Sequence, residues 1–321
     1  MTIAAFSDWL SNTAPSQFIQ VTSWIIPAVQ TVHILCIALL LSAAVIVDLR
    51  IFGAGLRSET LVQVADRYIP KVWACLPVLL VTGLILIVAE PGRTLTNPAF
   101  YLKMVSLLLV IGVTLWLHRY ARSARPLAPC RRCWPSSRYC CGRPSSSPAV
   151  SSLTSNRSEE LAAMIHSFAE WLQNLPLAVL VSESWFPQVE SAHVFALTLF
   201  LGLLLTVDLR LIGWGSQHMR FTQLSDQLLP WTWLAFGCAA ITGGLLFMAN
   251  ATTYVDNVPF QAKMALLVLA GLNMGFFQFV TFRGVAAWDD RAATGAARWA
   301  GITSLVLWTG IVAFGRWIGF V

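Results

Sequence analysis

Two histidines lie 160 positions apart in matching apolar segments, and they are the residues of this sequence best suited to chemistry. His33 follows Pro27 by six residues, and His193 follows Pro187 by six. At 1.5 Å per residue, each imidazole lies about 9 Å along a helix that begins at the proline. A neutral imidazole at that depth could ligate haem or a metal, or relay protons. The alternative is a structural histidine that hydrogen-bonds to a neighbouring helix.

A six-coordinate haem b needs two axial ligands. His118 is a poor second ligand for His33, because it lies near the opposite end of its own apolar run. In the second half of the chain Gln278 takes the place of His118. The sequence therefore favours His33 and His193 as a cofactor-binding pair from two bundles, with haem b as the candidate cofactor.

Charged residues recur in pairs at the ends of the apolar runs. An Asp-Leu-Arg triplet closes the first run of each half, and residues two apart do not face each other on a helix, so we expect each to pair with another helix or with lipid headgroups. Asp66 and Asp226 are predicted to cap the second helix, and a lysine that snorkels to the interface opens the third. These polar membrane positions are Asp48, Arg50, Asp66, Lys103, Asp208, Arg210, Asp226 and Lys263.

The four acids are expected to be structural, and no catalytic residue is predicted. The sequence contains no Walker loop, HExxH, GxSxG or dinucleotide-binding fingerprint. It therefore gives no positive sign of an enzyme.

The elements that position these residues are predicted to be membrane-spanning helices. The chain is 57% hydrophobic and 11% charged, against about 45–50% and about 25% in soluble domains. The net charge of +6 does not indicate a nucleic-acid partner, because the basic residues cluster beside apolar runs. We predict an all-α polytopic protein in contact with the lipid bilayer, with seven spans of roughly 20 residues. The spans are Ile26–Val47, Val72–Ala89, Tyr101–Leu117, Val189–Val207, Thr232–Ala249, Gln261–Phe279 and Trp299–Ile318.

The two halves of the chain repeat each other. The segment HILCIALLLSAAVIVDLRIFG is repeated 160 positions later as HVFALTLFLGLLLTVDLRLIG, and the same offset relates the two halves as far as Met104 and Met264. We predict an internal duplication into two homologous four-helix-type bundles. Residues 1–119 form the first, with three spans, and residues 164–321 form the second, with four. The two bundles are expected to associate, or the chain to form a homo-oligomer.

The distribution of Lys and Arg places the start of each half outside the membrane. We therefore expect a bacterial inner-membrane protein whose N-terminus is periplasmic. Three spans leave the chain inside, yet the second half should also start outside. The intervening segment, residues 120–163, contains PCRRCWPSSRYCCGRPSSS. It is too polar to cross, since one arginine at the bilayer centre costs about 2.5–3.5 kcal/mol.

A shifted reading frame would resolve this conflict. Read one base out of frame, the codons of Cys130 to Ser155 can encode LPPLLAVVSLLLWTAVVVAGRLIAYI, which resembles SLVLWTGIVAFGRWI in the last span. Met164 then looks like the start codon of a second gene. We interpret residues 120–163 as a frameshifted fourth span plus an intergenic region. The alternative is a zinc site in a cytoplasmic linker, with the ligands Cys130, Cys133, Cys140 and Cys141.

Each half resembles a family of small four-span bacterial membrane proteins of unknown function, the DUF6644-like group. The resemblance is carried by the histidine of the first span, the Asp-Leu-Arg exit, the Asp-x-x-x-Pro start of the second span and the Lys-Met start of the third. It implies no established activity. A looser likeness to four-helix copper-resistance domains and b-type cytochromes is an analogy of fold alone. The leading hypothesis is a redox-accessory or haem-binding membrane subunit, and the alternatives are a small-solute or ion permease subunit and a purely structural subunit.

Overall fold

The protein is described by a computed structural model that covers residues 2–53, 59–123, 156–214, 219–289 and 293–320. Within these ranges the chain is helical and has no strand. The first half contributes α1 (Ile3–Ser11), α2 (Ala14–Val21), α3 (Ile25–Ile51), α4 (Leu61–Ala89), α5 (Pro91–Leu95) and α6 (Pro98–Ser123). The second contributes α7 (Asn156–Gln173), α8 (Pro176–Leu180), η1 (Val181–Trp185), α9 (Phe186–Ile212), α10 (Phe221–Ala249), α11 (Ala251–Asp256), α12 (Val258–Phe276), η2 (Phe277–Thr281), η3 (Phe282–Ala287), α13 (Gly295–Trp317) and η4 (Ile318–Phe320).

Six helical segments of the described chain are long and apolar enough to cross a membrane. They are Ile25–Ile51, Leu61–Ala89, Pro176–Ile212, Phe221–Ala249, Val258–Ala286 and Gly295–Phe320. The remaining predicted span lies in α6, a helix of 26 residues whose described apolar part, Pro98–Val113, is shorter. Large apolar side chains cover the outside of the bundle; Leu102, for example, is 69% exposed. The chain is therefore an all-α, multi-pass membrane protein, as the composition predicts.

Helix α4 begins before the acid predicted to cap it. Thr60 and Gln63 form a capping box, in which the Thr60 hydroxyl accepts from the Gln63 amide (3.3 Å) and the Gln63 side chain accepts from the Thr60 amide (2.9 Å). Asp66 therefore lies inside the helix, and the prediction that it acts as the cap is wrong. The polar first turns of α4 precede its apolar run. A prediction based on the apolar run alone therefore places the start of the helix too late in the sequence.

The same correction applies to Asp226 in α10. This helix begins at Phe221, and its first turn is held by Asp289, whose carboxylate accepts from the Thr222 amide (2.8 Å) and hydroxyl (2.7 Å). Asp226 is exposed on the second turn, and Pro230 lies in the helix interior.

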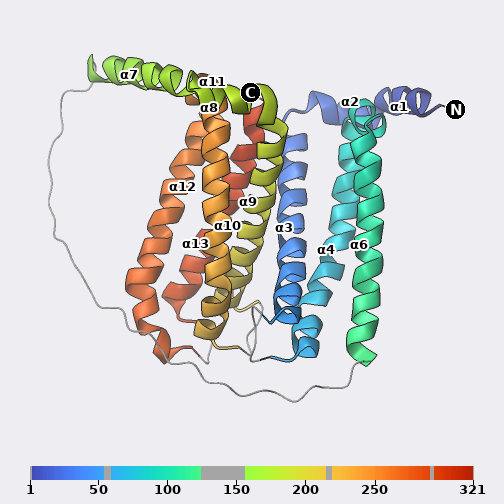
Figure 1. The fold of residues 1–321 in the computed structure, drawn as a ribbon, viewed down its shortest axis with the longest axis vertical. Helices are drawn as coiled ribbons and strands as arrows, with labels where there is room; N and C mark the ends of the chain where they lie inside the picture. The colour runs from blue at the N-terminus through green and yellow to red at the C-terminus, as the bar shows by residue number, and fades with distance from the viewer. Residues whose placement is uncertain (1, 54–58, 124–155, 215–218, 290–292, 321) are drawn as a thin grey trace.

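The two halves share a core in which α3 packs against α9 (Figure 1). A buried apolar cluster contains residues of both, among them Ile46 and Val64 with Leu203 and Phe221. The helices approach most closely at Gly202, where a Cβ atom would overlap the Ala38 carbonyl and lie 2.7 Å from Cβ of Ser42. Small residues at this contact permit close packing of helix backbones.

Short helices lie across one end of the bundle, which we call the leader end. Figure 1 shows α1, α2 and α7 there, with both α3 and α9 starting from it. We call the other end the loop end. In the leaders, Phe6 stacks near Trp9 (ring centroids 5.7 Å apart) and Phe168 near Trp171 (5.6 Å). Both tryptophans are more than half exposed, as expected of helices at a membrane interface.

Helix α6 ends at the loop end, whereas α7 begins at the leader end (Figure 1). Residues 120–123 belong to α6 and residues 156–163 to α7. The rest of the predicted linker, with Cys130, Cys133, Cys140 and Cys141, lies outside the described residues. The frameshifted span and the zinc site therefore stay predictions.

Candidate functional site

Each of the two histidines contacts a Thr-Gly pair on the next long helix of its own half. Nδ1 of His33 lies 2.8 Å from the Thr82 hydroxyl of α4. Nδ1 of His193 lies 3.1 Å from the Thr242 hydroxyl of α10 and 3.0 Å from the Ala239 carbonyl. Both imidazoles are half-buried. The arrangement is the interhelical hydrogen bond that the structural interpretation of these histidines predicts.

The threonine contacts fix the tautomer of each ring. The Thr82 hydroxyl donates to the Val78 carbonyl (2.7 Å), and the Thr242 hydroxyl donates to the Cys238 carbonyl (2.7 Å). With its single proton engaged, each hydroxyl can only accept from the imidazole. Nδ1 therefore carries the proton in the neutral ring, and Nε2 keeps a lone pair that could ligate a metal ion.

The ring of His193 is packed more tightly than that of His33. A Cβ atom at Gly243 would lie 3.0 Å from Cε1 of His193, whereas one at Gly83 would lie 3.7 Å from Cε1 of His33. The described contacts direct each histidine toward its own half and do not join the two rings. Among the described residues, no group of three or more His, Cys, Asp and Glu side chains could hold a metal ion.

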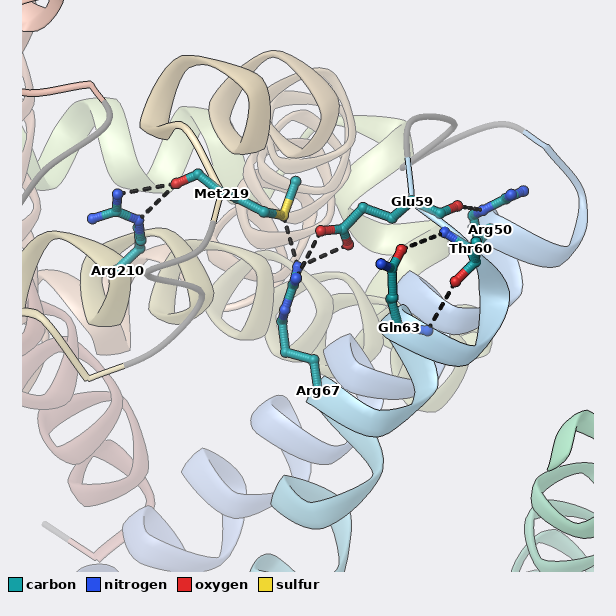
Figure 2. A network of polar contacts seen from close by, with 7 residues as sticks. All are labelled: Arg50, Glu59, Thr60, Gln63, Arg67, Arg210 and Met219. Atoms are coloured by element: carbon teal, nitrogen blue, oxygen red, sulfur yellow. Dashed lines mark hydrogen bonds and ion pairs between the residues drawn. The ribbon is translucent and has the colours of Figure 1, made fainter. Parts of the chain in front are cut away.

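The Asp-Leu-Arg arginines fasten the loops that follow them (Figure 2). Nε of Arg50 donates to the Glu59 carbonyl (2.6 Å). Arg210 donates to the Met219 carbonyl from Nε (3.2 Å) and from a terminal nitrogen (3.0 Å). Each acceptor lies nine residues after its arginine, so both arginines hold the residue that leads into the next long helix. The sequence marks the arginines, but their partners are backbone oxygens.

A third arginine links the two halves at the loop end. Arg67 of α4 forms an ion pair with Glu59 (2.7 Å) and contacts the sulfur of Met219 (2.7 Å) in the second half. The side chains of Arg67 and Glu59 are only 16% and 13% exposed. Figure 2 shows this guanidinium between the two loops. Sequence reasoning missed this residue, because nothing in the residue types of the loops signals a contact across 152 positions.

The two acids of the triplets have different surroundings. Asp208 is 5% exposed, and the Ser304 side chain of α13 is in hydrogen-bonding contact with its carboxylate. Asp48 is exposed and lines an apolar groove between α3, α4 and α6. The repeated sequence therefore does not produce a repeated environment.

A polar cavity of about 370 Å³ opens at the leader end. Three cations, Arg93, Lys103 and Arg316, line it with the carboxylate of Glu90, which forms an ion pair with Arg93 (3.3 Å). Gln30 holds Arg316 of α13, accepting from Nε (2.9 Å) and from a terminal nitrogen (2.7 Å). The cavity thus combines α3 to α6 of the first half with α13 of the second. The repeat alone could not predict this, because Arg316 comes from the far end of the chain.

The equivalent place in the second half is filled differently. Lys263 packs there against α13, with its ammonium 3.5 Å from where a Cβ atom of Gly315 would lie. Burial, and then the charge of Glu190, raise the pKa of Tyr254 in the adjoining α11. In the part of the chain that the structure describes, the first-half cavity therefore gathers three cations around open space, whereas the ammonium of Lys263 packs against α13.

Residues 184–321 match the model of a family of unknown function, DUF6644. No curated protein and no solved structure matches the chain. The fold defines a multi-pass membrane protein, and its second half is similar to a family of unknown function.

Proposed function

We propose that the chain is a bacterial inner-membrane protein made of two sister bundles, residues 1–119 and 164–321, with a periplasmic leader end. The 160-position sequence repeat and the paired Arg50 and Arg210 contacts support two related units. Among the residues whose side chains the structure describes, the loop end carries more basic residues than the leader end, in agreement with the positive-inside rule: Arg50, Arg67, Arg119, Arg210, Arg220, Arg283 and Arg298, against Arg93, Lys103, Lys263 and Arg316.

We propose that the polar cavity at the leader end binds a small oxyanion, so that the protein is an anion-binding membrane subunit without catalytic residues. The observation that carries this function is the convergence of Arg93, Lys103 and Arg316 on one cavity with Glu90 as its only acidic lining residue. Glu90 pairs with Arg93 (3.3 Å), so one carboxylate faces three cations, and the remaining like charges repel one another. An anion between them removes that cost. Arginine in particular matches the oxygens of carboxylate and phosphate groups.

The position of the cavity suggests two sources for the anion. At the end of a membrane bundle the oxyanion can be a free solute, such as phosphate or a carboxylate, or the phosphate of a lipid headgroup. A bound solute would favour the permease alternative, whereas a bound lipid would favour a structural subunit. The shared chemistry is an oxyanion held by guanidinium and ammonium groups.

Binding to the purified protein tests this function. Native mass spectrometry would measure retention of phosphatidylglycerol against phosphatidylethanolamine, and titration with inorganic phosphate would measure solute binding. We expect Arg93→Gln combined with Lys103→Gln to weaken the bound anion by about tenfold or more, because two charge contacts are lost. Arg283→Gln, an exposed cation at the loop end, should leave binding unchanged. Equal binding by both variants would contradict the function.

A specific observation also favours haem b as a second candidate. In both histidines the Nδ1 proton is engaged, and no described contact occupies the Nε2 lone pair, which is the state that an axial ligand requires. His33 and His193 would each supply one ligand, and both rings would have to turn from their own half toward the shared haem. An absorbance spectrum of the detergent-purified protein would show a Soret band that is lost in His33→Ala and in His193→Ala. A spectrum without that band in protein produced with excess haem would remove the candidate.

A further inference from the structure

An apolar groove of about 280 Å³ runs between α3, α4 and α6. Figure 1 shows α6 standing apart from α3, whereas in the second half α13 packs against both α12, the counterpart of α6, and α9, the counterpart of α3. The groove is lined by one acidic residue, Asp48, together with Tyr68 and apolar side chains. The side chain of Asp48 is exposed beside this groove.

The residues of the second half that correspond to the groove are covered by α13. Phe200, which corresponds to Leu40 of the groove, stacks on Trp308 of α13 with ring centroids 4.7 Å apart. Asn273, which corresponds to Val113, donates to the Ala300 carbonyl of α13 (3.1 Å).

The acids and the helix ends show the same difference. Asp208, which corresponds to Asp48, contacts Ser304 of α13. Next to it, Gly301 of α13 packs on Leu211, which is 3% exposed. The corresponding Ile51 is 45% exposed. The groove of the first half therefore corresponds to the surface that α13 covers in the second half. In the described part of the first half, no helix covers this surface.

The leader end of α13 offers a second comparison. Arg316 of α13 reaches across to Gln30 in the first half. The residue that corresponds to Gln30 is Glu190, which is exposed and lies close enough to Arg316 for the two charges to interact. A helix seated in the groove like α13 would bring its own arginine to this carboxylate, a better partner for a guanidinium than the amide of Gln30.

We infer that the groove is the seat of a fourth membrane-spanning helix, and that its occupant is the helix encoded one base out of frame at codons 130–155. The expected sequence SLLLWTAVVVAGRLI keeps serine, tryptophan and arginine at the spacing of Ser304, Trp308 and Arg316. In the seat, the serine meets Asp48, the tryptophan covers Leu40 and the arginine reaches Glu190. This inference rests on the repeat and the groove, and it is independent of the anion cavity.

A co-expressed single-span probe tests this seat. The probe is a tagged segment with the sequence LPPLLAVVSLLLWTAVVVAGRLIAYI, expressed with the full chain. We expect the tagged probe to co-purify with the unsubstituted chain in mild detergent. Ala44→Trp, which fills the groove, should abolish co-purification while the chain keeps its elution profile. Co-purification that survives Ala44→Trp, or none with the unsubstituted chain, would overturn the inference.

Disulfide formation then fixes the position of the probe. Gly301 lies against Leu211, so the alanine three residues before the probe's serine should lie against Ile51. A cysteine in place of that alanine should cross-link to Ile51→Cys, because the Cβ atoms come within disulfide range. Phe279→Cys, 67% exposed and at the same end of the bundle, is the matched control and should not react. Equal reaction at both positions, or Ile51→Cys chains that pair with each other in place of the probe, would contradict the seat.

Discussion

At the scale of single residues, Arg50 and Arg210 both donate to the backbone carbonyl nine residues later, but they differ in how deeply they are buried. Arg210 is 0% exposed and donates twice to the Met219 carbonyl, whereas half-buried Arg50 donates once to Glu59. Lysine cannot reproduce the two-nitrogen contact. We expect Arg210→Lys to lower the free energy of unfolding by about 1.5–3 kcal/mol, and Arg50→Lys by less. Thermal unfolding in detergent, followed by circular dichroism, measures both; equal losses would contradict the assigned contacts.

The glycines beside the histidines provide a matched pair of substitutions. Gly243→Ala would put a Cβ atom 3.0 Å from the His193 ring, whereas Gly83→Ala leaves an ordinary 3.7 Å contact with His33. We expect Gly243→Ala to displace the ring and break its bond to Thr242, and Gly83→Ala to be tolerated. Nitrogen-15 NMR of labelled histidine would report a changed Nδ1 signal in the first variant alone. An unchanged spectrum of Gly243→Ala would show that the ring is not confined.

The sequence could predict the histidines and the arginines, but not what they touch. Glu59 and Met219 have unlike side chains, and their common role depends on the backbone carbonyl that every residue has, so no residue type signals it. The Thr60-x-x-Gln63 pattern is the sequence signature of the observed start of α4. The predicted span begins only at Val72, because it is defined by the apolar run. The anion cavity needs Arg316 beside Gln30, and only the packed helices bring these together.

At the scale of helices, the close contact between α3 and α9 depends on Gly202, which has no side chain. Even a methyl group at Gly202 would overlap the Ala38 carbonyl, which belongs to the backbone and cannot rotate away. We expect Gly202→Ala to separate the two helices and to destabilise the protein by about 1–3 kcal/mol. Gly271→Ala in α12 is the control, since nothing lies within 4 Å of its added Cβ, and it should be neutral or stabilising. Thermal unfolding of both variants compares them, and a neutral Gly202→Ala would show that α3 and α9 do not pack as described.

At the scale of the whole molecule, the two halves run in the same direction, which constrains how the chain crosses the membrane. Both α3 and α9 start at the leader end, yet α6 finishes at the loop end (Figure 1). The parallel repeat that we propose needs an even number of crossings in each unit, and α3, α4 and α6 supply three. We therefore expect a fourth crossing to complete the first unit, so that the second unit starts again from the leader end.

Thiol labelling of cells tests this parallel arrangement. Thr96→Cys, beside the start of α6, and Ser167→Cys, in α7, are exposed toward the leader end, and Arg283→Cys, in η3 between α12 and α13, is exposed toward the loop end. We expect a membrane-impermeant maleimide to label the first two from the periplasm and the third only after the inner membrane is permeabilised. The unsubstituted chain measures the background from the native cysteines. If Ser167→Cys needed permeabilisation while Thr96→Cys did not, the second half would be inverted. The shared core of α3 and α9, which requires both helices to start on the same side, could not then form.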